Sequence, residues 1–296
     1  NSYKRDKETL EQIRKCCFNF IYKPVQKVTL YDIEKSKEKM KQYKKSGIDR
    51  AWRLLFKGFR IASSPSNRLI PYNIMDDENL KKPVSEKITE KVKPLTVEEE
   101  KRLNEILDNE ERTHPYRNIV KLELITAMRI GETLARSINN IDKENKKMLI
   151  NNTLTEDTDG TVILGEHTKT YNKTTGIDEG IRNFPISSEI DEIISEQTKD
   201  NITNIYGLLF WDYEKNTFIS PKEINAWLRR LNAKYKISKT LHNHKLRHTR
   251  ITRWKEAGMD MEAIQYLAGH VEGSEITNKV YIDVSENFAF EQLEKA

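Results

Sequence analysis

The chain has little cysteine and no long apolar run, and each absence excludes a class of protein. Its only cysteines, Cys16 and Cys17, are neighbours, which rarely bridge to each other and leave no CxxC spacing for zinc. We therefore expect two ordinary helix residues in a protein of the reducing cytoplasm. No apolar run reaches the roughly eighteen residues of a membrane span, and no signal-peptide pattern opens the chain.

The length of 296 residues predicts two domains, each able to bury its own core. Internal repeats and low-complexity segments are absent from the sequence. The chain begins with Asn1 rather than methionine, so we expect an N-terminal region to precede it.

Positive charge gathers in the first third of the chain. Residues 1–90 hold 21 Lys and Arg against 12 Asp and Glu, whereas the remainder holds 30 against 34. This asymmetry indicates that the first domain binds a polyanion, for which DNA or RNA is the usual candidate. A solvated, lysine-rich helical surface is the alternative.

The first domain, residues 1–76, is predicted to be a compact helical module. Thr29 is a suitable N-cap, and the Ser63-Ser64-Pro65-Ser66 segment ends a helix. Apolar residues recur at helical spacing in 6–22, 29–45 and 48–61. Residues 77–95, which are charged and contain Pro83 and Pro94, are predicted to be a linker.

The second domain, residues 96–296, combines helices with a few strands. Thr96 and Glu99 form a capping-box pattern at its start, and Ser220-Pro221 with Glu223 repeats that signal. Helices are expected over 97–109 and 115–138, then from Ser188 onward, with Gly258 ending the helix that begins near His244 and another over 261–268. Strands are expected over 148–154, 162–171 and 181–186, with a tight turn at Asp159-Gly160. The fold class is therefore mainly α with a small antiparallel β-sheet (α+β), and an amphipathic tail runs from Phe288 to Leu293.

His244 and Arg247 are three residues apart, so a helix presents both on one face. A guanidinium offers a planar set of donors for phosphate oxygens, and an imidazole can move a proton. A basic surface helix would give the same pattern.

Arg129 and Lys169 are further candidates for contact with phosphate. Arg129 follows an apolar stretch, and Glu132 is spaced to hold its guanidinium, although a purely structural salt bridge explains the pair equally well. Lys169 is predicted on a strand, from which its ammonium could reach a phosphate or protonate a leaving oxygen. An exposed strand lysine is the alternative, and Lys173 and Arg182 are rivals on the same hairpin.

His270 and Tyr281 follow near the end of the chain. Alone, His270 would be a histidine favoured by the negative end of a helix dipole. Tyr281 alone would be a half-buried core aromatic. Taken in order with the basic residues before them, they complete a set suited to cutting a phosphodiester by covalent catalysis.

The order Arg129, Lys169, His244, Arg247, His270, Tyr281 resembles the tyrosine recombinase, or phage integrase, family. The segments TAMRIGE, TKT before a strand ending FPI, HKLRHT, LAGH and VYIDV carry this resemblance, which spans about residues 96–284. The first domain resembles the family's helical core-binding domain more loosely. The lysine-rich composition is similar to that of integrases of conjugative transposons. The interval from His270 to Tyr281 and the loop 172–180 are longer than the family's usual pattern.

The resemblance implies a site-specific recombinase that needs neither metal nor cofactor. Tyr281 would attack the scissile phosphate, form a 3′-phosphotyrosyl bond and release a 5′-hydroxyl. Arg129 and Arg247 would hold the nonbridging oxygens, and Lys169 would protonate the leaving oxygen. His244 and His270 would assist by hydrogen bonding and proton transfer, with Glu132 and His248 supporting them. Strand exchange would proceed through a Holliday junction.

The expected partner is double-stranded DNA, bound as a dimer and tetramer joined through the C-terminal tail, with an accessory directionality factor as a further partner. The tail could equally pack on its own domain. Candidate DNA contacts in the first domain are Lys35, Lys41, Lys44, Arg50, Arg53, Lys57 and Arg60.

Two alternatives remain open at this point. A type IB topoisomerase or a resolvase would use the same chemistry. A non-enzymatic helical DNA-binding regulator would bind DNA without forming a covalent complex.

Overall fold

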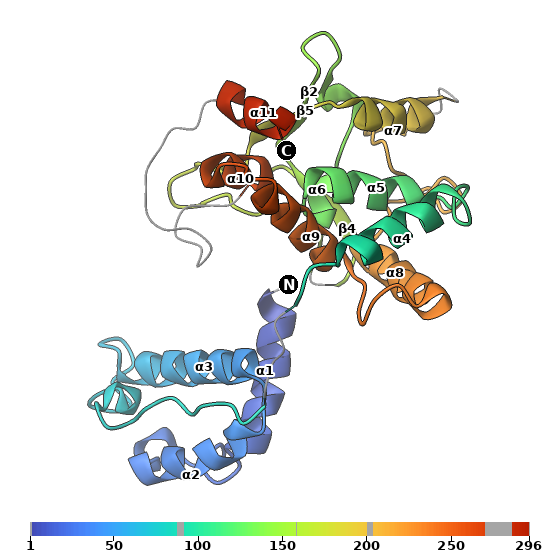
Figure 1. Cartoon of the computed structure of the whole chain (residues 1–296). Helices are drawn as coiled ribbons and strands as arrows, with labels where there is room; N and C mark the ends of the chain where they lie inside the picture. The colour runs from blue at the N-terminus through green and yellow to red at the C-terminus, as the bar shows by residue number, and fades with distance from the viewer. Residues whose placement is uncertain (1, 88–91, 158, 200–203, 270–285, 296) are drawn as a thin grey trace. The chain divides into compact units, whose positions relative to one another are not determined.

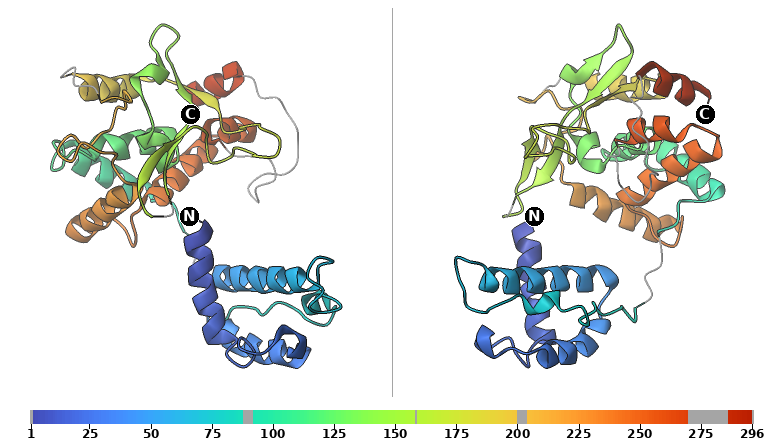
Figure 2. Two further views of the ribbon diagram at one scale, coloured as in Figure 1. Left: turned by 180° about the vertical axis from the view of Figure 1, so that it is seen from behind. Right: turned by 90° about the vertical axis from the view of Figure 1, so that its left-hand side faces the viewer.

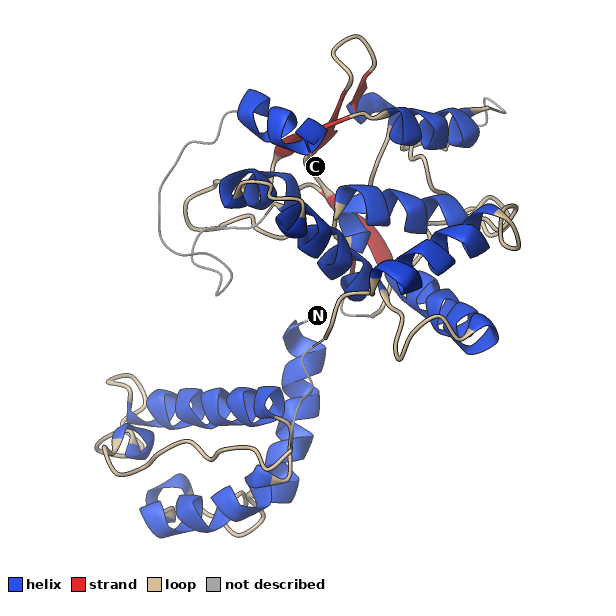
Figure 3. Ribbon diagram, viewed as in Figure 1, coloured by secondary structure: helices blue, strands red, loops and turns tan. Residues whose placement is uncertain are grey.

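The computed structural model describes residues 2–87, 92–157, 159–199, 204–269 and 286–295, and it divides into two compact units, Asn1–Lys91 and Val92–Ala296. Helices dominate both units, and short strands occur only in the described part of the second (Figure 3). The predicted class, mainly α with small antiparallel sheets, is confirmed. Among the described helices, none is long and apolar enough to cross a membrane.

The described part of the first unit contains three helices and two short 3₁₀ turns, and its helices can be followed in Figure 1. Thr29 caps the second helix as predicted, because its hydroxyl accepts from the Asp32 N–H while the Asp32 carboxylate accepts from the Thr29 N–H. The first helix ends at Cys16, earlier than the predicted 22, and the chain then turns through Phe20, which is buried. The elements are α1 (Ser2–Cys16), η1 (Val25–Lys27), α2 (Leu30–Lys41), α3 (Lys45–Ser63) and η2 (Ile74–Asp76).

Both cysteines are buried free thiols, and burial raises the pKa of Cys17 to about 12. Cys16 ends α1 as a helix residue, whereas Cys17 lies in the bend that follows, so the prediction of a helix position is wrong for Cys17. They pack in an apolar core with Ile33, Met40 and Phe59. Cys16 and Cys17 therefore help to fill a core and carry no reactive thiolate.

Both ends of the predicted linker 77–95 are packed on a unit. Leu80 lies in the core of the first unit, and the Ser85 hydroxyl donates to the Tyr43 carbonyl at 2.6 Å. Leu95 is buried in the second unit, where its N–H donates to the Thr249 hydroxyl at 2.9 Å. The division between the two units, after Lys91, falls within the predicted range.

The second unit places its strands along one side and most of its helices on the other (Figure 2). Strands β1, β2 and β5 form one antiparallel sheet, in that order, and β3 pairs with β4 in a second. The elements are α4 (Val97–Asp108), α5 (Arg117–Thr126), α6 (Ile130–Leu134), η3 (Ile138–Asn140), β1 (Ile141–Asp142), β2 (Lys147–Ile150), β3 (Thr153–Glu156), β4 (Val162–Gly165), β5 (Arg182–Pro185), α7 (Ser188–Thr198), α8 (Pro221–Tyr235), α9 (Asn243–Glu256), α10 (Met261–Ala268) and α11 (Glu286–Lys295).

The local signals for helix starts and turns are confirmed in this unit. Thr96 and Ser220 each form a capping box with the glutamate three residues later. Gly258 follows α9 with φ +81°, and Gly160 supports the β3–β4 turn with φ +96°. Both angles fall in the left-handed region, which glycine occupies at little cost.

Two long elements expected from the sequence are broken in the structure. The predicted helix 115–138 splits into α5 and α6, because Ala127 adopts a left-handed conformation with φ +52°. The predicted strand 148–154 splits into β2 and β3. The buried Arg136 guanidinium lies at that break and donates to the Leu149 carbonyl and to the Asn152 carbonyl and side chain. At the first break, the Arg247 guanidinium donates to the Ala127 carbonyl. In both places a tertiary contact therefore outweighs local propensity.

The core of the second unit is continuous from α4 to α10. Helix α9 packs beside α5 in its centre, and α10 and α11 lie against each other (Figure 1). Leu246 on α9 and Leu122 on α5 are fully buried in this core. Residues on α5, α6, α9 and α10 are therefore fixed relative to one another.

Candidate active site

Arg129 lies at the junction of α5 and α6, as its place after an apolar stretch predicted. It is the N-cap of α6, and its backbone N–H donates to Glu132 Oε2 at 3.1 Å. Its side chain donates from Nη1 to Glu132 Oε1 at 2.9 Å, and a quarter of that side chain is exposed (25%). The guanidinium of Arg129 is thus bound by the Glu132 carboxylate, while part of the Arg129 side chain is exposed to solvent.

Glu132 is fully buried, and both of its oxygens accept from arginines. Arg129 binds Oε1, and Arg182 Nη2 donates to Oε2 at 2.8 Å. Burial alone would raise the pKa of Glu132, but the charges of Arg182 and then Arg129 outweigh burial and lower it to about 2. Glu132 is therefore ionised at neutral pH.

Arg182 connects three parts of the second unit, although the sequence suggested it only as a rival of Lys169. Besides Glu132, its guanidinium donates to the Leu267 carbonyl at 2.8 Å and to the Gly180 carbonyl at 3.0 Å. It is 3% exposed, so it is not available to a substrate. The sequence signal that could have identified it is its spacing: Arg182 lies two residues before Phe184, so a strand places both side chains on the same, buried side.

Gly269 makes room for this buried arginine. It caps the C-terminus of α10 with φ +62°, and a Cβ there would lie 2.7 Å from Arg182 Cζ. The residue before His270 is thereby packed directly on the Arg182 guanidinium.

Arg247 lies on α9 between two helix C-termini. Its guanidinium donates to the carbonyl of Ala127, which caps α5, and to that of Ala268 at the end of α10, the latter at 2.7 Å. These ends carry the negative pole of the helix dipole, which stabilises a buried cation. Burial and then the charge of Arg129 lower the pKa of Arg247 to about 9, so it remains charged at neutral pH.

The cluster carries more positive than negative charge. Arg129, Arg182 and Arg247 face the single ionised carboxylate of Glu132. Because the charge of Arg129 disfavours the charged form of Arg247, an anion bound near these two guanidinium groups would relieve their repulsion. The arrangement favours binding of a phosphate-like group.

His244 lies in the first turn of α9 at the edge of this cluster. Partial burial and then the positive charge of Arg247 lower its pKa, with smaller contributions from His242, His248 and Lys169. The imidazole is therefore neutral near pH 7 and can accept a proton. His248 lies about one turn farther along α9.

Lys169 lies in a turn, so its predicted place on a strand over 162–171 is wrong. Strand β4 ends at Gly165, and Lys169 is exposed in the loop that leads to β5. The hydroxyls of Thr168 and Thr170 bind the Asp178 carboxylate, and these contacts fold the segment into a turn where strand pairing was expected. Its rival Lys173 lies in an exposed turn farther along the same loop.

Of the remaining predicted residues, His248 lies within the described parts of the chain. His248 is half-buried, and within the described residues its buried Nδ1 has no hydrogen-bond partner. His270 and Tyr281 lie outside the described residues. Their roles stay predictions.

Glu123 is a second buried glutamate, and no pattern in the sequence singles it out. It lies on α5, is 1% exposed, and its Oε2 has no partner within the described parts of the chain. Burial raises the pKa of Glu123 well above its ordinary value, and the charge of Arg247 opposes this only in part. A neutral Glu123 leaves the positive excess of the cluster intact.

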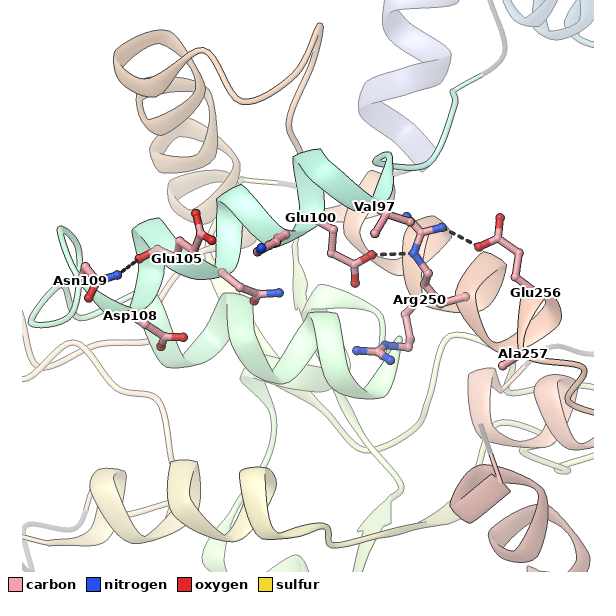
Figure 4. A pocket seen from close by; sticks show the side chains of 11 residues that line it. Val97, Glu100, Glu105, Asp108, Asn109, Arg250, Glu256 and Ala257 are labelled. Carbon is pink, nitrogen blue, oxygen red and sulfur yellow. Dashed lines mark hydrogen bonds and ion pairs between the residues drawn. The ribbon is translucent and has the colours of Figure 1, made fainter.

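A surface groove lies away from these residues. It is an open groove of about 800 Å³ between α4 and α9 (Figure 4). Arg253 spans part of it, with ion pairs to Glu100 at 2.7 Å and to Glu256 at 2.6 Å. None of the predicted catalytic residues lines it, so it is separate from the candidate site. Within the described residues no cluster of His, Cys, Asp and Glu could hold a metal ion.

The predicted DNA contacts of the first unit include a continuous basic face on α3. We call Arg50, Arg53, Lys57 and Arg60 the α3 basic face; all four are exposed, and their spacing places them on one side of the helix. Lys35 and Lys44 are exposed elsewhere, whereas Lys41 is half-buried and paired with Glu38 at 2.6 Å. The α3 basic face is the most regular of these candidates.

Comparison with known proteins shows which family this chain matches. A family model described as "Phage integrase family" matches residues 93–287. A probable integrase of prophage ps2 from Lactococcus lactis subsp. lactis (strain IL1403) is 29% identical over 174 residues, which are 55% of this chain and 43% of that protein. The integrase of Staphylococcus phage L54a is 30% identical over 181 residues, 60% of this chain and 50% of that protein. The chain thus matches about half the length of these relatives.

Solved structures share the fold across nearly the whole chain. The Tn1549 transposon integrase in complex with transposon right end DNA superposes with a TM-score of 0.72 at 22% identity, covering 98% of this chain and 93% of that one. A lambda integrase dimer bound to a COC′ core site superposes with a TM-score of 0.61 at 14% identity, covering 94% and 74%. At these identities the likeness concerns the fold.

The Glu132 carboxylate predicts a defined dependence of stability on pH. Its pKa is lowered in the folded state from 4.5 to about 2, so its ionisation stabilises the fold above pH 4.5 and this stabilisation is lost as the pH falls toward 2. At pH 7 we expect Glu132→Gln to lower the free energy of unfolding by about 3 kcal/mol. Urea unfolding followed by tryptophan fluorescence between pH 7 and pH 3 measures this difference.

The difference between the wild-type protein and Glu132→Gln should shrink only below about pH 4.5. Glu144→Gln, in the exposed turn between β1 and β2, is the matched control and should change the unfolding free energy by no more than about 0.5 kcal/mol. A Glu132→Gln protein as stable as the wild type at pH 7 would contradict the electrostatic role of this carboxylate.

Proposed function

The chain belongs to the phage integrase family, and from this membership we propose that it is a site-specific DNA recombinase of a mobile element. Its substrate is double-stranded DNA, which it cuts and rejoins through a covalent protein–DNA intermediate. The observation that carries the proposal is the excess of positive charge at Arg129, Arg182 and Arg247 around one buried carboxylate. A site of this kind requires an anion, and DNA phosphate is the anion that the family processes.

In the proposed cleavage step the Tyr281 hydroxyl attacks the scissile phosphorus. A bond forms from the phenolic oxygen to phosphorus, and the bond from phosphorus to the 5′ oxygen breaks. The phenol proton passes to a neutral imidazole, for which the lowered pKa of His244 suits this residue, with His270 assisting. Lys169 gives a proton to the leaving 5′ oxygen, so that a free 5′-hydroxyl results.

Arg129 and Arg247 stabilise the transition state by binding the nonbridging oxygens. Both guanidinium groups are held before the substrate arrives, Arg129 by Glu132 and Arg247 by the carbonyls of Ala127 and Ala268. Preorganised donors of this kind lose little free energy to reorganisation during the reaction. Because the phosphodiester energy is retained in the phosphotyrosyl bond, rejoining needs no nucleotide or metal.

Recombination joins two such cleavages through a Holliday junction. We place the reaction on chromosomal DNA in the bacterial cytoplasm, with an accessory directionality factor favouring either insertion or excision. The structural relatives, which are integrases bound to transposon right end DNA and to a core site, support DNA as the partner.

Formation of a covalent adduct tests the proposal. Nicked duplexes tiled across the DNA that borders the gene for this chain should trap the wild-type protein as an adduct on a denaturing gel. Tyr281→Phe should abolish the adduct, because the phenolic oxygen that bonds to phosphorus is absent. Arg247→Lys should retain DNA binding and cleave about 100-fold more slowly, since a bidentate donor is replaced by a point charge.

The matched control for the tyrosine is Tyr266→Phe. The Tyr266 hydroxyl accepts from the Asn183 N–H at 3.3 Å in the core of the second unit, so its loss should leave the adduct intact. An adduct that persists in Tyr281→Phe would assign the nucleophile elsewhere. A wild-type protein that binds these duplexes without any adduct would instead indicate a DNA-binding regulator.

The α3 basic face is proposed as the main phosphate-binding surface of the first unit. Each phosphate contact releases counterions, so the logarithm of the affinity should fall linearly with the logarithm of the salt concentration. Replacing Arg53 and Lys57 by alanine should reduce this slope by roughly one for each phosphate that is no longer bound. Fluorescence anisotropy with labelled duplex at several salt concentrations measures the slope.

Lys41→Ala is the control for the α3 basic face, because its ammonium is already paired with Glu38. It should change the slope less than either Arg53→Ala or Lys57→Ala does. Equal slopes in all variants and the wild type would show that α3 does not contact phosphate.

The tail α11 is proposed to join neighbouring protomers on DNA. In the single chain, Phe290 and Leu293 pack on the core of their own unit, and the Asp260 N–H donates to Gln292 Oε1 at 3.3 Å. The same apolar side chains could cover the equivalent surface of a second copy, which would link protomers into a dimer and tetramer.

Deletion of residues 286–296 should therefore impair assembly more than stability. Sedimentation of the protein with duplex DNA should show single bound protomers in place of larger complexes, while the urea midpoint changes little. Glu294→Gln, on the exposed side of α11, should assemble as the wild type does. A deletion that lowers stability and assembly equally would restrict the tail to packing on its own unit.

A further inference from the structure

The loop between β4 and β5 is folded around one carboxylate. Asp178 accepts the Thr168 N–H at 2.7 Å on Oδ2, and it accepts the Gly180 N–H at 3.1 Å and the Thr168 hydroxyl on Oδ1. The Thr170 hydroxyl donates to the same oxygen at 3.4 Å. Asp178 thus binds the residues on both sides of Lys169.

The two threonines that flank Lys169 are also fixed against each other. Their hydroxyls are 2.8 Å apart, and the Thr170 N–H donates to the Thr168 hydroxyl at 3.3 Å. Gly180 lies against this pair so closely that a Cβ there would overlap both hydroxyl oxygens. The backbone at Lys169 is therefore held by side-chain contacts, beside the isolated β-bridge between Tyr171 and Asp178.

This turn is anchored to the arginine cluster. The Gly180 carbonyl accepts from Arg182 Nη1 at 3.0 Å, and the same guanidinium binds Glu132, the partner of Arg129. A chain of contacts thus runs from Asp178 through Gly180 to Arg182 and the candidate site. The tip of the loop closes separately, with the Asn172 N–H donating to the Ile177 carbonyl at 2.8 Å.

We propose that Asp178 is a positioning residue that holds the Thr168–Thr170 turn so that Lys169 Nζ reaches the leaving 5′ oxygen. This inference rests on the proposed function, in which Lys169 is the general acid. A long side chain on an exposed loop would otherwise sample many positions, and proton transfer requires hydrogen-bond distance. The four hydrogen bonds to Asp178 restrict the backbone from which the lysine extends.

A leaving group that needs no proton tests this role. In duplexes with sulfur in place of the bridging 5′ oxygen, the bond from phosphorus to sulfur breaks and a thiolate leaves unprotonated. Lys169→Ala should cleave the oxygen duplex at least about 100-fold more slowly than the wild type, the usual contribution of a general acid. It should cleave the sulfur duplex within a fewfold of the wild type.

Asp178→Ala should show the same pattern as Lys169→Ala. It should cleave the oxygen duplex slowly and the sulfur duplex at close to the wild-type rate. Asp178→Asn keeps one oxygen to accept from Thr168 and Gly180, so it should lose less activity on the oxygen duplex. Glu179→Gln, an exposed neighbouring carboxylate, is the matched control and should cleave both duplexes at the wild-type rate.

The outcomes separate this inference from the proposed function. An Asp178→Ala protein that is slow on both duplexes, or normal on both, would overturn the positioning role. The Asp178→Asn variant decides the same point if the alanine variant does not fold, as judged by circular dichroism. Two other results would instead refute the chemistry assigned to the site. One is the absence of any adduct with the wild-type protein, and the other is slow cleavage of the sulfur duplex by Lys169→Ala.

Discussion

The buried Glu132 carboxylate is the interaction on which the arrangement of the second unit depends. Within the described parts of the chain, it is the acid that pairs with both Arg182, which is buried, and Arg129, which is partly exposed. A buried guanidinium without such a partner would cost several kcal/mol. Through Arg182 the same carboxylate is linked to the end of α10 and to the loop that carries Lys169. Glu132 thereby links three segments that are far apart in sequence: its own helix α6, the loop before β5 and the end of α10.

Helix ends complete the electrostatics of the site. Arg247 is buried between the last carbonyls of α5 and α10, whose dipoles favour a cation without supplying a full negative charge. A second ionised carboxylate would have reduced the excess positive charge, but burial raises the pKa of Glu123 and so disfavours its ionised form. The site therefore retains positive charge for an anion, as the proposed binding of DNA phosphate requires.

Local signals in the sequence predicted the elements whose stability is local. The capping boxes at Thr96 and Ser220 and the turn at Gly160 depend on neighbouring residues, and all are present in the structure. The failures are elements that distant residues reshape. Arg136 lies where a predicted strand divides into β2 and β3, and Arg247 binds the carbonyl of Ala127 where a predicted helix divides into α5 and α6. Neither contact is visible in a short window of sequence.

The sequence by itself determined the fold class, the basic character of the first unit and the family, because composition, periodicity and ordered motifs are properties of the chain. It also singled out Arg129, Glu132 and Arg247. Only the tertiary structure decided how these residues are held, since Arg182, Gly269 and Asp178 act through contacts across the fold. Lys169 shows the difference: its motif was readable, but its turn exists because Asp178, nine residues later, closes it.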